Sequence, residues 1–156
     1  MKTILNDFDL NNLDPETLKQ DLYGNFASRI GKLDFVRNKL KIIQIEFVEN
    51  MIKKKGGCIL DGRDIGTEIL PNADFKFYID APIEIRAKRR FKQLYSTNKL
   101  IEFKNILLDL EKRDISDKSR KNSPLILSED SILIDTEFLN PHQVLKKALY
   151  YIKKNK

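Results

Sequence analysis

The chain alternates short apolar runs with long helical patterns, and this alternation restricts the fold that it can adopt. Three apolar runs predict strands, at residues 58–60, 75–80 and 131–135. Apolar residues at three- and four-residue steps predict helices, at about residues 15–30, 34–55, 83–95, 100–115 and 141–154. Strands that are joined through helices favour a parallel sheet. The sequence therefore predicts an α/β fold in a single domain.

The region around the first predicted strand carries further signals. Asp34 is expected to cap the helix at 34–55, and Gly56 and Gly57 are expected to end it. The run at 58–60 is short, apolar and bounded by glycines, which is typical of a buried parallel strand. We therefore expect Cys58 to be a buried strand residue.

The composition excludes some classes of protein and leaves others open. A single cysteine cannot form an intrachain disulfide, which favours a reducing compartment. The longest uninterrupted apolar run is 148–152, and an acidic residue comes as early as Asp7, so neither a membrane span nor a signal peptide is predicted. The net charge of +6 fits an anionic partner, and it fits a solvated lysine-rich surface equally well. We expect a cytoplasmic protein with no membrane partner.

Residues 61–67, with the sequence DGRDIGT, directly follow the first predicted strand. Ligands of open parallel sheets bind beyond the carboxyl ends of the strands, where this segment would lie. Arg63 can hold a phosphate group through two hydrogen bonds, Asp64 can accept from a base or a sugar, and Gly62 and Gly66 allow close approach of the backbone. The alternative is a turn at the strand end, held by an Arg–Asp pair.

Two further groups of charged residues have helical spacing. Arg113, Asp117 and Arg120 would share one helix face, either as solvent-exposed ion pairs or as a site for ribose hydroxyls and a phosphate. Arg86, Arg89 and Arg90 would also share a face, and their mutual repulsion favours an anion beside them. The single histidine, His142, indicates neither a metal site nor a catalytic triad, and no metal-ligating residues are predicted.

The order and spacing of these motifs resemble those of one enzyme family. The matching segments are 61–67, 71–74, 76–79, 86–94, 111–114, Asp117, Arg120, 123–125 and 134–136. In this order they resemble bacterial cytidylate (CMP/dCMP) kinases, which belong to the nucleoside monophosphate kinases. The resemblance extends from about residue 20 to the C-terminus and implies the phosphate-loop nucleoside monophosphate kinase fold.

The resemblance implies a role for each matching residue. Ser28, Arg37 and Asp64 would read the cytosine base, Arg113 and Asp117 would hold the ribose, and Arg63 and Arg120 would bind the acceptor phosphate. Arg86, Arg89 and Arg90 would flank the nucleotides near a lid at about 95–103. Arg86, Arg90 and Arg120 are the expected catalytic residues, and Arg86 and Arg89 the expected contacts to ATP.

The implied reaction is the transfer of the γ-phosphoryl group of ATP to CMP or dCMP, with Mg²⁺, in pyrimidine nucleotide metabolism. Such a transfer depends on positioning and on charge neutralisation and requires no protein nucleophile. The resemblance implies small-molecule nucleotides as partners, and a monomer for the full-length family form.

One part of the family pattern does not occur in these 156 residues, namely the phosphate loop G-x-x-x-x-G-K-[ST]. In the family a central strand, this loop and its helix come first. We therefore expect an N-terminally truncated domain, with a helical acceptor-binding part at about 15–55 and a core at 56–156. The chain alone is expected to be inactive and marginally stable, since a central strand would be missing. A separately encoded N-terminal half is one expected partner.

Two other hypotheses stay open at this point. The chain could be a non-catalytic CMP-binding remnant, which titration with CMP and the sequence upstream of Met1 would test. A nucleic-acid-binding module rests on the positive charge alone, without aromatic residues interleaved on a basic face, so no nucleic-acid partner is expected.

Overall fold

The computed structural model describes residues 30–31, 33–96, 99–121 and 123–154. The chain divides into two compact units, Met1–Ile59 and Leu60–Lys156, and each is described by itself. Ser28 and residues 15–29 of the predicted first helix lie outside the described residues.

The first unit contains the long helix α3 (Asp34–Lys55). The residue that caps its N-terminus is Leu33, in an extended conformation, so the prediction that Asp34 is the cap is wrong by one position. Asp34 lies in the first turn, where its carboxylate faces the positive end of the helix dipole. The predicted stop is confirmed: Gly56 adopts a left-handed conformation with φ +78°, and its N–H donates to the carbonyl of Ile52 at 2.9 Å.

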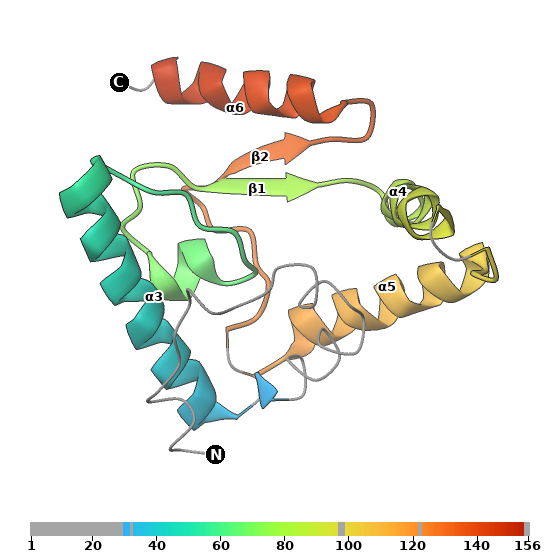
Figure 1. Cartoon of the computed structure of the whole chain (residues 1–156), viewed down its shortest axis with the longest axis horizontal. Coiled ribbons are helices and arrows are strands. Elements are labelled where there is room, and N and C mark those ends of the chain that lie inside the picture. The colour runs from blue at the N-terminus through green and yellow to red at the C-terminus, as the bar shows by residue number, and fades with distance from the viewer. Residues whose placement is uncertain (1–29, 32, 97–98, 122, 155–156) are drawn as a thin grey trace. The chain divides into compact units, whose positions relative to one another are not determined.

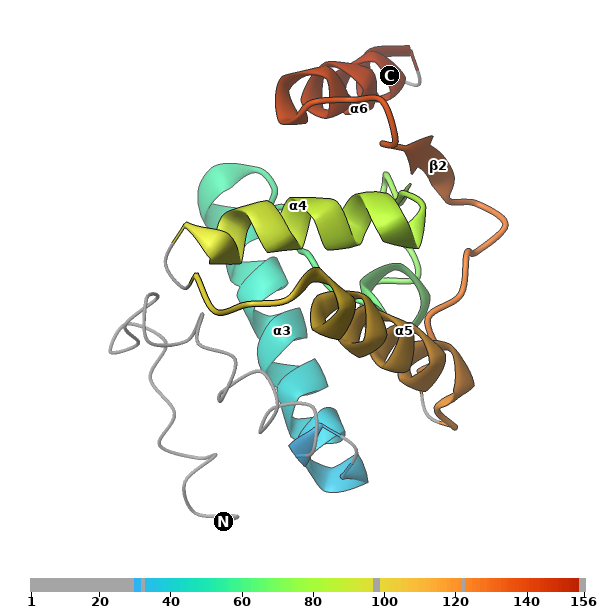
Figure 2. The same ribbon diagram turned by 90° about the vertical axis from the view of Figure 1, so that its right-hand side faces the viewer.

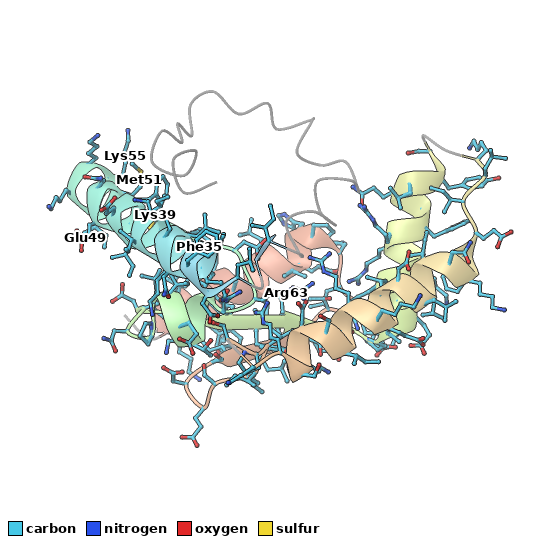
Figure 3. The ribbon with its side chains drawn as sticks, turned by 90° about the horizontal axis from the view of Figure 1, so that it is seen from below. Phe35, Lys39, Glu49, Met51, Lys55 and Arg63 are labelled. Atoms are coloured by element: carbon cyan, nitrogen blue, oxygen red, sulfur yellow. The ribbon has the colours of Figure 1, made fainter. Side chains whose placement is uncertain are left out.

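Apolar side chains on α3 are distributed between buried and exposed positions. Val36 and Val48 are buried, whereas Leu40 and Phe47 of the predicted apolar stripe remain exposed. Figure 3 shows side chains on α3, among them Phe35 and the charged Lys39, Glu49 and Lys55. The periodicity therefore predicted the helix correctly but not the burial of its whole stripe.

The second unit contains a parallel pair of strands, β1 (Phe77–Asp80) and β2 (Ile132–Asp135) (Figure 1). Phe77 pairs with Ile132 at one end and Asp80 with Asp135 at the other. The two predicted strands and their parallel direction are thus confirmed. The register places two carboxylates side by side at the carboxyl ends of the strands.

The predicted strand at 58–60 is wrong. Residues 57–61 form no strand, Cys58 is exposed, and the side chain of Ile59 is 97% exposed. A strand forms only where a neighbouring strand accepts and donates its backbone hydrogen bonds. Within the described residues β1 and β2 pair with each other and with no third strand, so an apolar run at 58–60 has no ladder to join.

Three helices accompany the strands: α4 (Ile83–Tyr95), α5 (Phe103–Ser119) and α6 (Pro141–Lys154). Helix α4 packs on α5 (Figure 2). Ala87 of α4 and Ile106 of α5 are buried. Helix α6 lies beside β2, whose Ile134 is fully buried. Helix α5 begins and ends later than the predicted 100–115, and this shift brings Asp117 into the helix. No helix in the described ranges combines the length and apolar character that crossing a membrane requires.

Candidate functional site

A cavity of about 860 Å³ extends along β1 and β2 and includes the carboxyl ends of both strands. Residues from the segment after Leu60, from both strand ends, from α4 and from α5 line it. Its charged lining residues are Asp61, Arg63, Asp80, Arg86, Arg113, Asp114, Lys118 and Asp135. Cations for phosphate and carboxylates for hydroxyl or amino groups therefore face the same space.

The segment that carries Arg63 has a defined backbone. It leads into a π-helical turn, η2 (Ile65–Ile69), in which the N–H of Leu70 donates to the carbonyl of Ile65 at 2.7 Å. Ile69 is buried and anchors the turn. A Cβ atom on Gly62 would lie 2.9 Å from Cγ1 of Ile65, so this position accepts glycine and little else. The spacing predicted a turn here but gave no sign of a π-helix.

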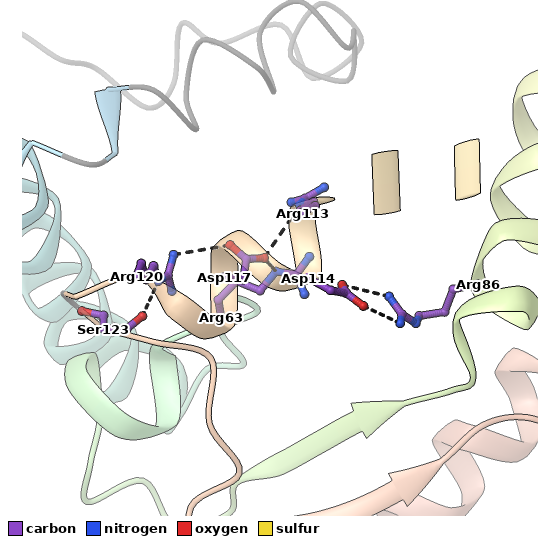
Figure 4. Close-up of polar contacts among 7 residues, drawn as sticks. All are labelled: Arg63, Arg86, Arg113, Asp114, Asp117, Arg120 and Ser123. Carbon is purple, nitrogen blue, oxygen red and sulfur yellow. Dashed lines mark hydrogen bonds and ion pairs between the residues drawn. The ribbon is translucent and has the colours of Figure 1, made fainter. Parts of the chain in front are cut away.

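Asp117 is the centre of an ion-pair cluster (Figure 4). Its carboxylate lies 3.1 Å from Nε of Arg63, 3.9 Å from Nε of Arg113 and 3.7 Å from a terminal nitrogen of Arg120. The predicted grouping of Arg113, Asp117 and Arg120 is confirmed as geometry, and Arg63 joins it from the loop. We call these four residues the Asp117 cluster.

Arg120 reaches this cluster from outside the helix. It follows the last residue of α5, Ser119, in an extended conformation, so the assumption of a continuous helix through residue 120 is wrong. Its Nε donates to the carbonyl of Ser123, and this bond turns the guanidinium toward Asp117. Although Arg120 lies beyond the helix, its side chain still reaches the predicted partner Asp117.

The Asp117 cluster has more positive than negative charge and is incompletely hydrogen-bonded. Three guanidinium groups surround one carboxylate, whose side chain is 15% exposed. One terminal nitrogen of Arg120 is buried without a hydrogen-bond partner, and the Asp117 oxygen 3.1 Å from Nε of Arg63 is ion-paired without the geometry of a hydrogen bond. A buried polar atom without such a partner costs roughly 1–3 kcal/mol. A buried guanidinium nitrogen without an acceptor, beside an excess of positive charge, is a group that an anion can satisfy.

Arg86 on α4 forms a separate pair with Asp114 on α5. Its two terminal nitrogens donate to the two carboxylate oxygens at 3.1 and 2.6 Å (Figure 4). Its Nε donates to the carbonyl of Ala81 at 2.9 Å. The hydrogen bonds to Asp114 raise the pKa of Arg86 above its ordinary value, against the opposing effect of burial. Sequence reasoning did not single out Asp114, although its position one turn before Asp117 places the two on neighbouring parts of α5.

The arginines of α4 reach different acceptors in this structure, and their common anion-binding face stays a prediction. Arg89 donates to the hydroxyl of Thr136 at 3.0 Å and to backbone carbonyls at Thr136, Glu137 and Leu139. Arg90 donates to Gln93 at 3.2 Å. Helical spacing fixes where these side chains start, but their length lets each reach a different neighbour.

Tyr78 is a further cavity residue that sequence reasoning missed. Burial, followed by the carboxylate of Asp80, raises the pKa of the Tyr78 hydroxyl above its ordinary value. Arg63 and Arg86 both act in the opposite direction. Tyr78 thus lies within electrostatic range of the Asp117 cluster and of the Arg86–Asp114 pair.

The remaining predicted site residues are placed as follows. Asp64 lies next to Arg63, and the ion pair of Arg63 is with Asp117. Arg37 lies on α3 in the first unit, where it donates to the carbonyl of Gly31 at 3.2 Å. Ser28 lies outside the described residues.

Three of the carboxylates that line the cavity already have protein partners. The described residues contain no group of three or more residues that could hold a metal ion. In the cavity, Asp114 is paired with Arg86, and oxygens of Asp80 and Asp135 accept backbone N–H bonds from Ala81 and Glu137. Mg²⁺ at phosphoryl-transfer sites is held by one or two carboxylates together with phosphate oxygens and water, so a nucleotide would have to supply most of its ligands.

Comparison with known proteins identifies similar sequences. Residues 2–154 match the family model for cytidylate kinase. A cytidylate kinase of Bartonella bacilliformis is 41% identical over 140 residues, which cover 90% of this chain and 63% of the relative. Cytidylate kinases of Rickettsia rickettsii and Caldicellulosiruptor bescii are each 38% identical over 143 residues, covering 92% and 90% of this chain and 62% and 61% of the relatives. The chain thus spans less than two thirds of the length of these relatives.

Proposed function

Since this chain belongs to the cytidylate kinase family, we propose that it supplies the nucleoside monophosphate site of an enzyme that phosphorylates CMP or dCMP. ATP is the proposed phosphoryl donor, and CDP or dCDP the product. The α/β fold with a parallel sheet and flanking helices is the one that the family assignment requires. The observation that carries the proposal is the Asp117 cluster, with its excess of positive charge and its buried guanidinium nitrogen without an acceptor.

The charge of the cluster suits a nucleoside monophosphate. Three guanidinium groups and one carboxylate leave two positive charges, which a phosphate monoester at neutral pH neutralises. Arg63 and Arg120 would donate to the phosphate, while Asp117 and Arg113 would hold the ribose hydroxyls. Asp64, together with Ser28 and Arg37, is the proposed reader of the cytosine base.

The proposed transfer depends on position and charge. The acceptor phosphate at Arg63 and Arg120 would face the incoming γ-phosphoryl group, and arginines would neutralise the equatorial oxygens of that group. Arg86 already lies on the cavity wall and is the arginine best placed for this task. A nucleotide contact by Arg89 would have to replace its hydrogen bonds to residues 136–139, and a role for Arg90 stays a proposal from the resemblance.

For residues 1–156 alone we propose CMP binding without phosphoryl transfer. The printed sequence holds no G-x-x-x-x-G-K-[ST] loop to bind the β- and γ-phosphates of ATP. A phosphate-loop segment, encoded upstream or separately, would complete the enzyme. The second candidate function is a CMP-binding remnant for which no such segment exists.

The test combines binding with activity. Isothermal titration of purified 1–156 with CMP should give saturable binding that exceeds binding of AMP, and an ADP-release assay should give no turnover. Asp117→Asn should weaken CMP binding, whereas Asp109→Asn, an exposed carboxylate on the same helix, should not. Absence of CMP binding would contradict the proposal. Turnover by 1–156 alone would contradict the inactivity. Turnover that appears only when the upstream segment is added would exclude the remnant.

A further inference from the structure

The Arg86–Asp114 pair is the most completely formed ion pair that lines the cavity. Both carboxylate oxygens of Asp114 accept from Arg86, and the carbonyl of Ala81 accepts from the third nitrogen. The side chains are 30% and 19% exposed, so the pair is partly shielded from water. A guanidinium held on two sides by three acceptors loses most of its conformational freedom.

Arg86 nevertheless keeps donors for a ligand. A guanidinium has five N–H groups, and these three bonds use three of them, one on each nitrogen. One N–H on each terminal nitrogen is left over. Since Arg86, Arg63 and Arg113 line the same cavity, an anion in that cavity can meet donors that are already oriented.

Helix α5 links this pair to the Asp117 cluster. Asp114 and Asp117 are three residues apart on one helix, which separates them by about 4.5 Å along its axis. The same rigid element therefore holds Arg86 through Asp114 and Arg63 through Asp117. This arrangement fixes the spacing between two groups of phosphate-binding donors.

We propose that Asp114 is a positioning residue, which holds Arg86 at the cavity wall so that its remaining N–H groups bind the second phosphoryl group of a cytidine nucleotide. The proposal rests on the proposed function, because the first phosphate of that nucleotide lies at the Asp117 cluster. It assigns to Asp114 no contact with the nucleotide itself. The alternative is that Asp114 competes with the phosphoryl group for Arg86. In that case removal of the Asp114 carboxylate would raise the affinity for CDP instead of lowering it. The additional bond from Nε of Arg86 to Ala81 favours positioning, since it orients the guanidinium and leaves the remaining donors available.

The experiment compares CDP with CMP, which differ only in the second phosphoryl group. Isothermal titration measures both affinities for 1–156, for Asp114→Asn, for Arg86→Gln and for the double variant. Asp109→Asn is the matched control on α5. We expect Asp114→Asn to lower CDP affinity about tenfold, because one charge-assisted contact from Arg86 is misplaced. CMP affinity should stay within about twofold of that of the parent chain. In the Arg86→Gln background, Asp114→Asn should change neither affinity.

Several outcomes would overturn the inference. Normal CMP binding with an unchanged CDP/CMP affinity ratio in Asp114→Asn would refute it and leave the proposed function intact. A raised ratio would establish competition instead, and an effect that persists without Arg86 would assign Asp114 a different role. A parent chain that binds neither nucleotide would refute both proposals. Circular dichroism verifies folding, and if Asp114→Asn does not fold, Asp114→Glu must lower the ratio in the same direction.

Discussion

The arginines of the Asp117 cluster converge on one carboxylate, whereas the arginines of α4 diverge to separate acceptors. Arg63, Arg113 and Arg120 leave that carboxylate surrounded by an excess of positive charge. Arg86 and Arg89 are instead bonded to acceptors from α5, from Ala81 and from residues 136–139. The arginine side chain therefore has two different roles in this molecule. On the proposed function the converging arginines bind the nucleotide, whereas the bonds of Arg89 stabilise the packing.

This contrast makes the two groups differ in what a substitution should change. Variants of the Asp117 cluster should alter both ligand affinity and stability, because its ion pairs join different segments and its excess of positive charge attracts an anion. Variants of Arg89 should alter stability alone. Arg86 is the intermediate case, since a satisfied ion pair places it at the cavity.

The largest effect is expected from Asp117→Asn. Removing the carboxylate leaves three guanidinium groups without their common counter-ion, and we expect the free energy of unfolding to fall by about 2 kcal/mol. Urea denaturation measures this loss, with Asp109→Asn as the control, which should change stability by less than about 0.5 kcal/mol. Inorganic phosphate should restore part of the stability of Asp117→Asn, because an anion replaces the lost charge. Equal stability of the two variants would show that the cluster is not a cooperative unit.

The next effect is expected from Arg89→Gln, compared with Arg90→Gln on the same helix. Arg89 joins α4 to the segment after β2 through charge-assisted hydrogen bonds, so its loss should cost about 1.5 kcal/mol of unfolding free energy. The bond of Arg90 to Gln93 stays within α4, and its loss should cost about 0.5 kcal/mol. Neither variant should alter CMP affinity. A loss of CMP binding in Arg89→Gln with unchanged stability would show that Arg89 binds the nucleotide and does not stabilise the packing.

Elements with strong local patterns could be predicted from the sequence, and long-range contacts could not. The helices at 83–95 and 141–154 were predicted at their observed bounds, because apolar spacing and Pro141 are local signals. The strand at 58–60 was wrong because an apolar run does not reveal whether a neighbouring strand exists to pair with it.

The same holds for the candidate site, where contacts within one helix could be predicted and contacts between elements could not. The grouping of Arg113 with Asp117 could be predicted, since one turn of helix relates them. The pairing of Arg63 with Asp117 and that of Arg86 with Asp114 each join different elements, and they depend on how those elements pack. Tyr78 was missed for the same reason, since its environment is formed by residues from other segments.

A smaller effect distinguishes Arg63→Gln from Arg113→Gln within the Asp117 cluster. Arg63 lies 3.1 Å from the carboxylate, whereas Arg113 lies at 3.9 Å and is 65% exposed. We expect Arg63→Gln to cost about 1 kcal/mol of unfolding free energy and Arg113→Gln less than about 0.5 kcal/mol. Affinities for cytidine and CMP separate the proposed roles. Arg63→Gln should weaken CMP binding alone, and Arg113→Gln should weaken binding of both. Equal losses for cytidine in the two variants would contradict the assignment of Arg63 to the phosphate.

The smallest effect concerns Tyr78, which responds to both groups of arginines. The pKa of the Tyr78 hydroxyl is raised in the folded chain, so the hydroxyl ionises first in the unfolded chain. The stability that the neutral hydroxyl contributes is therefore fully present below the unfolded pKa. It is lost as the pH rises through the folded pKa. The stability difference between the parent chain and Tyr78→Phe should therefore decrease above about pH 10. Urea denaturation of both proteins at several alkaline pH values measures this difference. The other tyrosines and the lysines titrate in both proteins, so their contributions cancel in the difference.

The same hydroxyl can report on the two groups separately. Arg63 lowers the pKa of Tyr78 more than Arg86 does, so Arg63→Gln should raise that pKa further than Arg86→Gln. The chemical shift of tyrosine labelled with carbon-13 at Cζ gives both pKa values, with the signal assigned by its disappearance in Tyr78→Phe. A pKa that stays unchanged in Arg63→Gln would place the positive charge of Arg63 too far from Tyr78 to act on it, and would argue against its action on a nucleotide in the same cavity.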